Sequence, residues 1–187
     1  MEIVLNVFLI CYFLLYTESA MSSEFAPGGC TYRSNYDYLN REYFNLKDVQ
    51  AIDEENTHYL ANMVLYAIGE EVFVTFSPTP KLWQGAPVYE IGLGLGENRN
   101  LNFYSFFDSN DGKIEHSKSK GTILTPGQPN KIHVTITTMG DVHVFINDFY
   151  EYSTTIFDGI DRDIKYVSMT GWKHRVDFYF NCTKPEW

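Results

Sequence analysis

Residues 88–96 read VYEIGLGLG, a stretch that fits two incompatible folds. An acidic residue and alternating glycines after an apolar run begin the cofactor loop of many nucleotide- and S-adenosylmethionine-binding enzymes, but only where a helix follows and its N-terminal amides meet the cofactor. Residues 98–108 read NRNLNFYSFFD, which is β-prone, aromatic and poor in helix formers. We therefore expect strand, turn and strand, no helix and no cofactor. The glycines then let a neighbouring strand or a ligand approach closely.

Short strands continue along the chain from residue 57. Runs of β-branched and aromatic residues recur every ~8–12 residues, separated by Gly, Pro, Asn or Asp. This spacing predicts an all-β protein, an antiparallel β-sandwich of the jelly-roll or lectin-like type. The predicted strands are 59–68, 71–77, 88–95, 100–108, 121–124, 131–138, 141–147, 151–156, 166–170 and 176–181. Residues 39–51 fit a helix or a strand almost equally well.

The hairpin of residues 131–147 can be placed in register. The apolar residues of its two strands share one face only if Ile136 opposes Val142, which leaves residues 138–140 as a three-residue loop ending in glycine. His133, His143 and Asp141 then lie on the opposite face. They are ligand types that suit a metal, but the two rings are diagonal neighbours at best, so we expect solvated polar positions and no metal.

The first residues indicate secretion. Residues 3–16 form an apolar run broken only by Asn6, which is short for a membrane span but matches the core of a signal peptide. Cleavage after Ser19 places small residues, Thr17 and Ser19, before the cut. Residues 1–19 are therefore predicted to be a signal peptide; a retained membrane anchor is the alternative.

The mature chain has the size of one domain. We expect residues 20–56 to be an N-terminal extension packed on the sandwich, 57–182 the β-sandwich domain and 183–187 a C-terminal tail. A net charge of −10 and a pI near 4.8 argue against nucleic acid and anionic membrane surfaces as partners. The sequence also predicts no membrane insertion after signal cleavage. The lysines at 113, 118 and 120 are assigned to one polar loop.

Two cysteines remain near the ends of the mature chain, Cys30 and Cys182. In an oxidising compartment we expect them to pair and tie the N-terminal segment to the last strand; two free thiols are the alternative. Cys182 is also the middle residue of the N-glycosylation triplet Asn181-Cys182-Thr183. Sugar transfer and disulfide formation compete there, so glycosylation of Asn181 stays open.

Catalytic patterns are weak. The chain has no Gly-x-Ser-x-Gly elbow. Glu90 and Asp108 are an alternative acid–base pair, although strand carboxylates beside glycine-rich turns are common without chemistry. No catalytic residue is predicted.

Aromatic residues are the better indication of function. With 14 Tyr, 14 Phe and 3 Trp the chain has more rings than one core needs, so we expect some at the surface. Flat rings beside polar groups are typical of sugar-binding surfaces; core packing is the alternative for each ring. The predicted ligand site is a shallow surface lowered by the glycines of residues 92–96. Its residues are Tyr89, Glu90, Asn98, Arg99, Tyr104 and Trp172.

The order of several segments is also informative: FVTFS at 73–77, YEIG at 89–92 with NRN at 98–100, KIHVT at 131–135 with GDVHV at 140–144, and VSMTGW at 167–172. This order resembles the farnesoic acid O-methyltransferase domain family over roughly residues 57–182. The resemblance implies a β-rich fold without a Rossmann-type cofactor domain, and it offers no catalytic residues to carry over. A signal peptide departs from the cytosolic hormone-synthesis enzyme that the family name suggests.

Together these features predict a secreted, non-catalytic, lectin-like module for carbohydrate on a cell or microbial surface, with a glycan or small molecule as ligand. A farnesoic acid O-methyltransferase-type enzyme of juvenile hormone synthesis is the first alternative. An extracellular structural or venom-type interaction protein is the second.

Overall fold

The computed structural model describes residues 29–35, 37–52, 58–81, 88–106, 113–119, 121–155 and 163–183. The predicted signal peptide and Asp108 lie outside the described residues. By its internal contacts the chain divides into Thr31–Asn181, which forms the sandwich, and a second unit of Met1–Cys30 with Cys182–Trp187.

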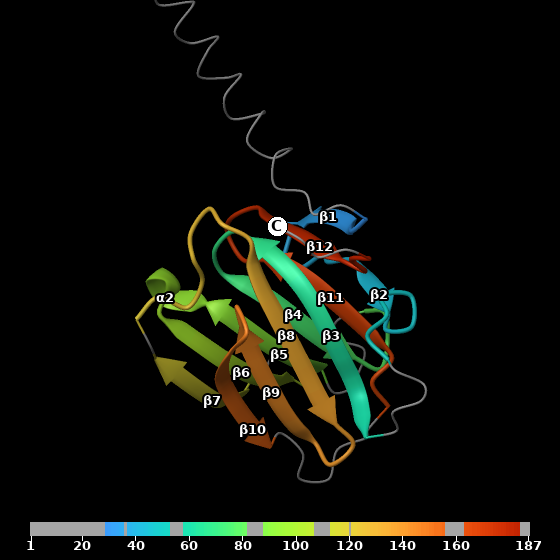
Figure 1. Ribbon diagram of the computed structural model, residues 1–187. Coiled ribbons are helices and arrows are strands. Elements are labelled where there is room, and N and C mark those ends of the chain that lie inside the picture. Colours follow the sequence, from blue (N-terminus) through green and yellow to red (C-terminus); the bar gives the residue numbers. More distant parts are fainter. Residues whose placement is uncertain are drawn as a thin grey trace, which may run out of the picture. The chain divides into compact units, whose positions relative to one another are not determined.

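Two six-stranded antiparallel sheets make up the sandwich (Figure 1). The first sheet has the order β1-β12-β3-β8-β9-β10 and the second β2-β11-β4-β5-β6-β7. The strands of the first sheet are β1 (Thr31–Asn35), β12 (Val176–Phe180), β3 (Tyr59–Ile68), β8 (Asn130–Thr137), β9 (Asp141–Ile146) and β10 (Phe149–Thr155). Those of the second are β2 (Tyr43–Asn45), β11 (Tyr166–Gly171), β4 (Val72–Ser77), β5 (Val88–Gly94), β6 (Asn100–Phe106) and β7 (Lys113–Ser119). The predicted antiparallel β-sandwich is confirmed.

The core lies between the two sheets and follows from strand alternation. Every second residue of β8 and β9 is apolar, and these side chains are buried in one cluster with those of β4 and β5. The predicted hairpin register is confirmed, since Ile136 opposes Val142. Gly140 closes the three-residue loop with a φ of 91°, a left-handed conformation that glycine adopts without steric cost. His133 accordingly stacks on Phe145, with ring centroids 5.4 Å apart.

Three strands were not predicted: β1, β2 and β7. All three lie at the ends of the sheet orders. An edge strand pairs on one side and is often short or charged, so its sequence carries less β signal. Residues 39–51 accordingly contain β2 and turns and no helix, and the lysines assigned to a loop at 113 and 118 lie on β7.

Residues 121–124, predicted as a strand, are not in a ladder. Ile123 and Leu124 are nevertheless buried. The backbone N–H of Ile123 donates to the carbonyl of Asn98 at 3.0 Å, and that of Leu124 donates to the Asn98 Oδ1 at 2.8 Å. The apolar run therefore belongs to the core without belonging to a sheet.

The expectation that no helix follows residues 88–96 also needs correction. A four-residue helical turn, α2 (Leu95–Asn98), comes directly after β5. Three of its residues have positive φ, 58° to 61°, so it is a left-handed turn inside a hairpin whose strands β5 and β6 are antiparallel. Its amides are not arranged as at the N-terminus of a regular helix, and the parallel strand that a cofactor loop requires is not present at this place. Among the described residues, no helix is long and apolar enough to cross a membrane.

The predicted disulfide is present between Cys30 and Cys182, 152 residues apart in sequence. Cys30 directly precedes β1, and Cys182 follows β12 by two residues. The unit that contains both cysteines also has a hydrogen bond from the N–H of Thr183 to the carbonyl of Gly29, 3.4 Å long.

Replacing both Cys30 and Cys182 with Ser should lower the free energy of unfolding by up to about 5 kcal/mol, because the bridge restricts a long loop of the unfolded chain. Denaturant titration of the oxidised protein and the double variant measures this loss. Alkylation of the folded wild type without reductant should label neither cysteine. Equal denaturation midpoints would contradict a stabilising role.

Candidate functional site

The candidate site is built on the outer face of the second sheet. Because Tyr89 and Ile91 of β5 point into the core, Glu90 between them points outward. Its cross-strand partners are Thr75 on β4 and Tyr104 on β6. These outward residues form one row across the sheet.

The outer face of β4 and β5 is covered. Every residue of the two strands is buried, which one packed face alone does not explain. Residues 37–41, between β1 and β2, lie over them, and we call this stretch the cover segment. A turn shapes it: the Asp37 carboxylate accepts hydrogen bonds from the backbone N–H of Leu39 and of Asn40, at 3.1 and 3.0 Å.

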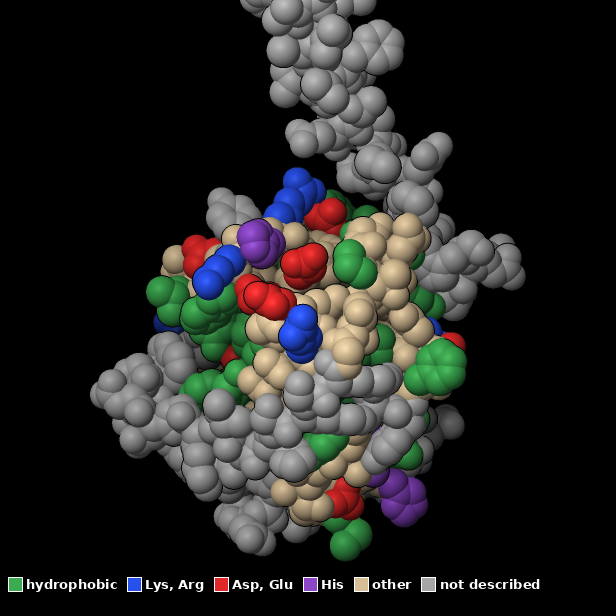
Figure 2. All heavy atoms as spheres, turned by 90° about the vertical axis from the view of Figure 1, so that its left-hand side faces the viewer, with side chains coloured by type: hydrophobic (Ala, Val, Ile, Leu, Met, Phe, Trp, Pro, Cys, Tyr) green, Lys and Arg blue, Asp and Glu red, His purple; other side chains and the backbone are tan. Residues whose placement is uncertain are grey.

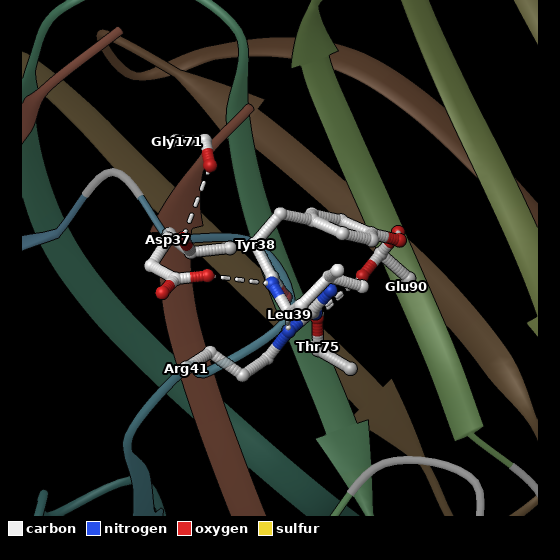
Figure 3. A network of polar contacts seen from close by, with 8 residues as sticks. Asp37, Tyr38, Leu39, Arg41, Thr75, Glu90 and Gly171 are labelled. Carbon is white, nitrogen blue, oxygen red and sulfur yellow. Dashed lines mark hydrogen bonds and ion pairs between the residues drawn. The ribbon is translucent and has the colours of Figure 1, made fainter. Parts of the chain in front are cut away.

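A buried ion pair attaches the cover segment to the sheet (Figure 3). The Nη1 of Arg41 lies 2.5 Å from Oε2 of Glu90, and the side chains are 0% and 1% exposed. The same nitrogen donates to the Thr75 hydroxyl, which donates to Glu90 Oε2 at 2.7 Å. Tyr38 donates its hydroxyl to the other carboxylate oxygen at 2.6 Å. Both oxygens of Glu90 are therefore hydrogen-bonded.

Arg41 also fixes Tyr38. Its Nε donates to the carbonyl of Tyr38 at 2.9 Å, and its guanidinium carbon lies 4.0 Å from the centre of the Tyr38 ring, a cation–π contact. The ring of Tyr38 meets Trp172 edge to face at 4.5 Å and Phe73 at 5.1 Å. The ion pair thus positions the aromatic side chains around it.

Arg41 and Tyr38 keep their protonation states at neutral pH. Burial alone would lower the pKa of Arg41, but the negative charge of Glu90 raises it overall. Burial, with the nearby Glu90, also raises the pKa of Tyr38. Arg41 stays a cation and Tyr38 a neutral hydroxyl donor, so Glu90 acts here as a structural anchor.

Beside this network lies a cavity of about 350 Å³. We call it the outer-face depression and define it by the residues that line it: Tyr38, Glu71, Phe73, Glu90, Leu95, Tyr104, Phe106 and Trp172. In Figure 2 hydrophobic side chains gather at the left edge of the molecule, the side of the second sheet. A second cavity of about 480 Å³ adjoins it, with Tyr38 and Trp172 lining both.

Gly92 gives the outer-face depression its depth. It lies on the outer face of β5, where a Cβ would come within 2.7 Å of Leu95 Cδ1 and 3.1 Å of Phe73 Cε1. Both of those side chains line the depression, and a larger residue would push them apart. The expectation that glycine lets neighbours approach applies at this position.

Three of the six predicted ligand residues, Glu90, Tyr104 and Trp172, line the outer-face depression. Tyr89 instead points into the core and is 2% exposed. Asn98 holds Leu124: its Nδ2 donates to the Leu124 carbonyl at 2.5 Å. The side chain of Arg99 is 66% exposed, and its nearest described anion is Glu97 at 3.9 Å. The structure therefore brings together half of the predicted set.

Sequence reasoning missed Tyr38, Glu71, Phe73, Leu95 and Phe106. Tyr38 comes from a segment 52 residues before its partner Glu90, and no local pattern links the two. One weak signal was available: β4 reads VFVTFS, and Phe73 lies on the face opposite to the apolar Val72, Val74 and Phe76. A large aromatic side chain on the outer face favours cover there. Among the described residues, no group of histidine, cysteine and carboxylate side chains could hold a metal.

Comparison with known proteins gives one family and several distant structures. The family model described as farnesoic acid O-methyltransferase matches residues 35–184. No curated protein matches the chain by sequence. Similar solved structures include a Caenorhabditis elegans galectin (8% identity, TM-score 0.49, covering 79% of this chain and 95% of that one). Others are sheep galectin-11 in complex with glycerol (11%, 0.46, 80% and 97%) and a Bacteroides ovatus endo-glucanase (7%, 0.47, 68% and 69%).

Replacing Arg41 with Met should lower the free energy of unfolding by about 3–5 kcal/mol, because Glu90 then stays buried without its cation. Adding Glu90→Gln should restore much of the loss, since no charge remains buried. Denaturant titration of the single and double variants measures the coupling. Arg99→Met, which removes an exposed arginine, serves as control and should cost less than about 1 kcal/mol. Equal losses for Arg41→Met and Arg99→Met would show that the buried pair does not hold the cover segment.

The Tyr43 hydroxyl is buried without a hydrogen-bonding partner among the described residues, and burial raises the pKa of Tyr43 to about 12. The folded state therefore disfavours the tyrosinate, and the stability from this group is present below pH 10 and lost as pH rises towards 12. Tyr43→Phe should leave stability at pH 7 unchanged or higher and should reduce the alkaline loss. Unfolding curves of both proteins from pH 7 to 12 test this. An unchanged alkaline slope would contradict it.

Proposed function

The chain belongs to the farnesoic acid O-methyltransferase family, and from that premise we propose that this member is a secreted binding module that holds carbohydrate in the outer-face depression and does not transfer methyl groups. The observation that carries the proposal is the lining of the depression, in which five aromatic side chains stand around two carboxylates.

Such a lining suits a sugar. The apolar face of a sugar ring stacks on an aromatic ring, and the hydroxyls around its rim need polar partners. Trp172, 44% exposed, offers a ring to a ligand from solvent. Tyr104 offers a second ring, and its hydroxyl is held by the Nδ2 of Asn102 at 2.7 Å. The volume lies within the range of small-molecule sites, ~300–1,000 Å³.

The adjoining cavity favours a ligand that is longer than the outer-face depression and extends beyond it. Tyr38 and Trp172 line both cavities, so a chain of sugars can continue from one to the other past the same two rings. A stacked ring with two or three hydrogen bonds gives millimolar to micromolar affinity, about 4–8 kcal/mol. Tight attachment to a surface would then require several copies to bind together.

The family name suggests a different class, methyl transfer to a carboxylic acid. The glycine-rich stretch does not support an S-adenosylmethionine loop, because β5 pairs antiparallel with both β4 and β6 and a left-handed turn follows it. The depression also does not favour a carboxylate substrate that would accept the methyl group. Glu90 is neutralised by Arg41, but Glu71 has no paired cation among the described residues and repels a carboxylate.

Secretion is part of the proposal. The Cys30–Cys182 disulfide supports an oxidising compartment, in agreement with the apolar run expected to be a signal peptide.

A glycan array probed with the wild-type protein identifies a ligand, and calorimetry then measures its affinity. Trp172→Ala combined with Tyr104→Ala should weaken binding at least tenfold, about 1.4 kcal/mol, because the stacking rings are lost. Phe149→Ala is the matched control, since Phe149 is an aromatic residue 72% exposed on β10 of the other sheet; it should leave the affinity unchanged.

Near-ultraviolet circular dichroism confirms that each variant is folded. Unchanged affinity in the folded Trp172/Tyr104 variant would place the glycan elsewhere. Micromolar binding of S-adenosylmethionine, lost in Gly94→Val, would favour the enzyme instead.

A further inference from the structure

The two carboxylates of the outer-face depression are in different states. Glu90 has both oxygens hydrogen-bonded and an arginine at 2.5 Å. Glu71, in the turn before β4, also lines the depression, but its Oε2 is buried and has no hydrogen-bonding partner in the described part of the chain. A buried carboxylate oxygen without a donor is costly, and the Glu71 side chain as a whole is only partly buried. A rotation that brings its carboxylate to an N–H of a ligand in the depression therefore gains more than apolar contact alone.

The aromatic walls select the charge of that donor. Tyr38, Phe73 and Trp172 contact one another, with centroids 4.5 to 6.0 Å apart, and Tyr104 stacks on Phe106 at 5.7 Å. The face of an aromatic ring carries partial negative charge and attracts a cation. A carboxylate among such rings favours an ammonium group over a neutral donor, because charge-assisted hydrogen bonds are about twice as strong as neutral ones.

The charge of the whole chain acts in the same direction. Its net charge of −10 raises the local concentration of cations and lowers that of anions near the surface. Arg41 is paired with Glu90 through Nη1; its Nη2 is buried without an acceptor among the described residues, but Arg41 does not line the depression.

We propose that the outer-face depression binds carbohydrate through a protonated amine that Glu71 receives, so that its ligand class is amino sugars with a free amino group. The inference rests on the proposed function and narrows it. An N-acetylated sugar has lost this charge, and a sugar acid carries the opposite one; both bind less well.

The test uses the tetramer of glucosamine and the tetramer of N-acetylglucosamine, titrated by calorimetry below neutral pH, where the amine is protonated. The wild type should bind the free-amine tetramer at least tenfold more tightly, and added salt should reduce the difference because charge is screened. Glu71→Gln keeps the size of the side chain and removes its charge. It should weaken binding of the free-amine tetramer about tenfold and leave the acetylated one unchanged.

Glu70→Gln is the matched control. Glu70 is the preceding residue of the same turn and is exposed, and it does not line the depression. The substitution makes the same change in net charge and should leave both affinities unchanged. Equal weakening by Glu70→Gln and Glu71→Gln would overturn the proposal, because it would show a general charge effect.

Failure of the amine inference and failure of the proposed carbohydrate function give different results. If both tetramers bind equally to the wild type and Trp172→Ala weakens both, the amine inference is wrong and the carbohydrate function stands. If neither binds, methylammonium, which carries N–H donors, is titrated by NMR as a probe of the cation site. Binding that Glu71→Gln abolishes would support the site for a cation and count against carbohydrate as its ligand; no binding would overturn both.

Discussion

The buried ion pair between Arg41 and Glu90 is the interaction on which the outer face of the second sheet depends. The cover segment has no ladder of its own, so side chains must hold it against β4 and β5. Burying two charges is expensive unless their remaining hydrogen bonds are made. Thr75 and Tyr38 make those of Glu90, which offsets part of the cost, while the Nη2 of Arg41 is buried without an acceptor among the described residues. Once Arg41 is fixed, Tyr38 is fixed over it, and Tyr38 and Trp172 form the wall that the two cavities share.

The central strands could be predicted from sequence, because a strand with neighbours on both sides carries a strong alternating or continuous apolar pattern. The alternation of apolar residues from Ile132 to Ile146 also predicted the register of the hairpin, because a slip by one residue would have turned the buried side chains to solvent. Of the four strands at the sheet ends, β10 was predicted and β1, β2 and β7 were not, because pairing on one side demands less of their side chains. Ile123 and Leu124 were misassigned for a different reason: they are buried in the core, but they lie in a loop that is bonded to Asn98 and pair with no strand.

The residues of the site could be predicted only where their positions on the strands place them on the outer face. Glu90 and Tyr104 lie on neighbouring strands at positions that alternate away from the core, and Trp172 follows the end of β11, so they could be grouped. Tyr38 and Arg41 reach the site through contacts between distant parts of the chain, for which one sequence has no signal. Tyr89 was included as a ring on the strand that carries the glycines, and Asn98 and Arg99 as polar groups that follow the glycines. In a strand, however, the immediate neighbour faces the opposite side, and in a turn an asparagine is often used to hold backbone.

The attachment of the cover segment at both ends has a kinetic consequence. Before the segment, β1 pairs with β12 at the edge of the first sheet, and after it, β2 pairs with β11 at the edge of the second sheet. Arg41, between β1 and β2 in the chain, is buried. Lifting the segment would break the β2 ladder and the ion pair together, and each 1.4 kcal/mol of that cost reduces the open population tenfold. A ligand therefore meets walls already in place. The association rate of the proposed ligand would then rise in proportion to its concentration, without a plateau set by an opening step, and differences in affinity between ligands would arise mainly from their dissociation rates.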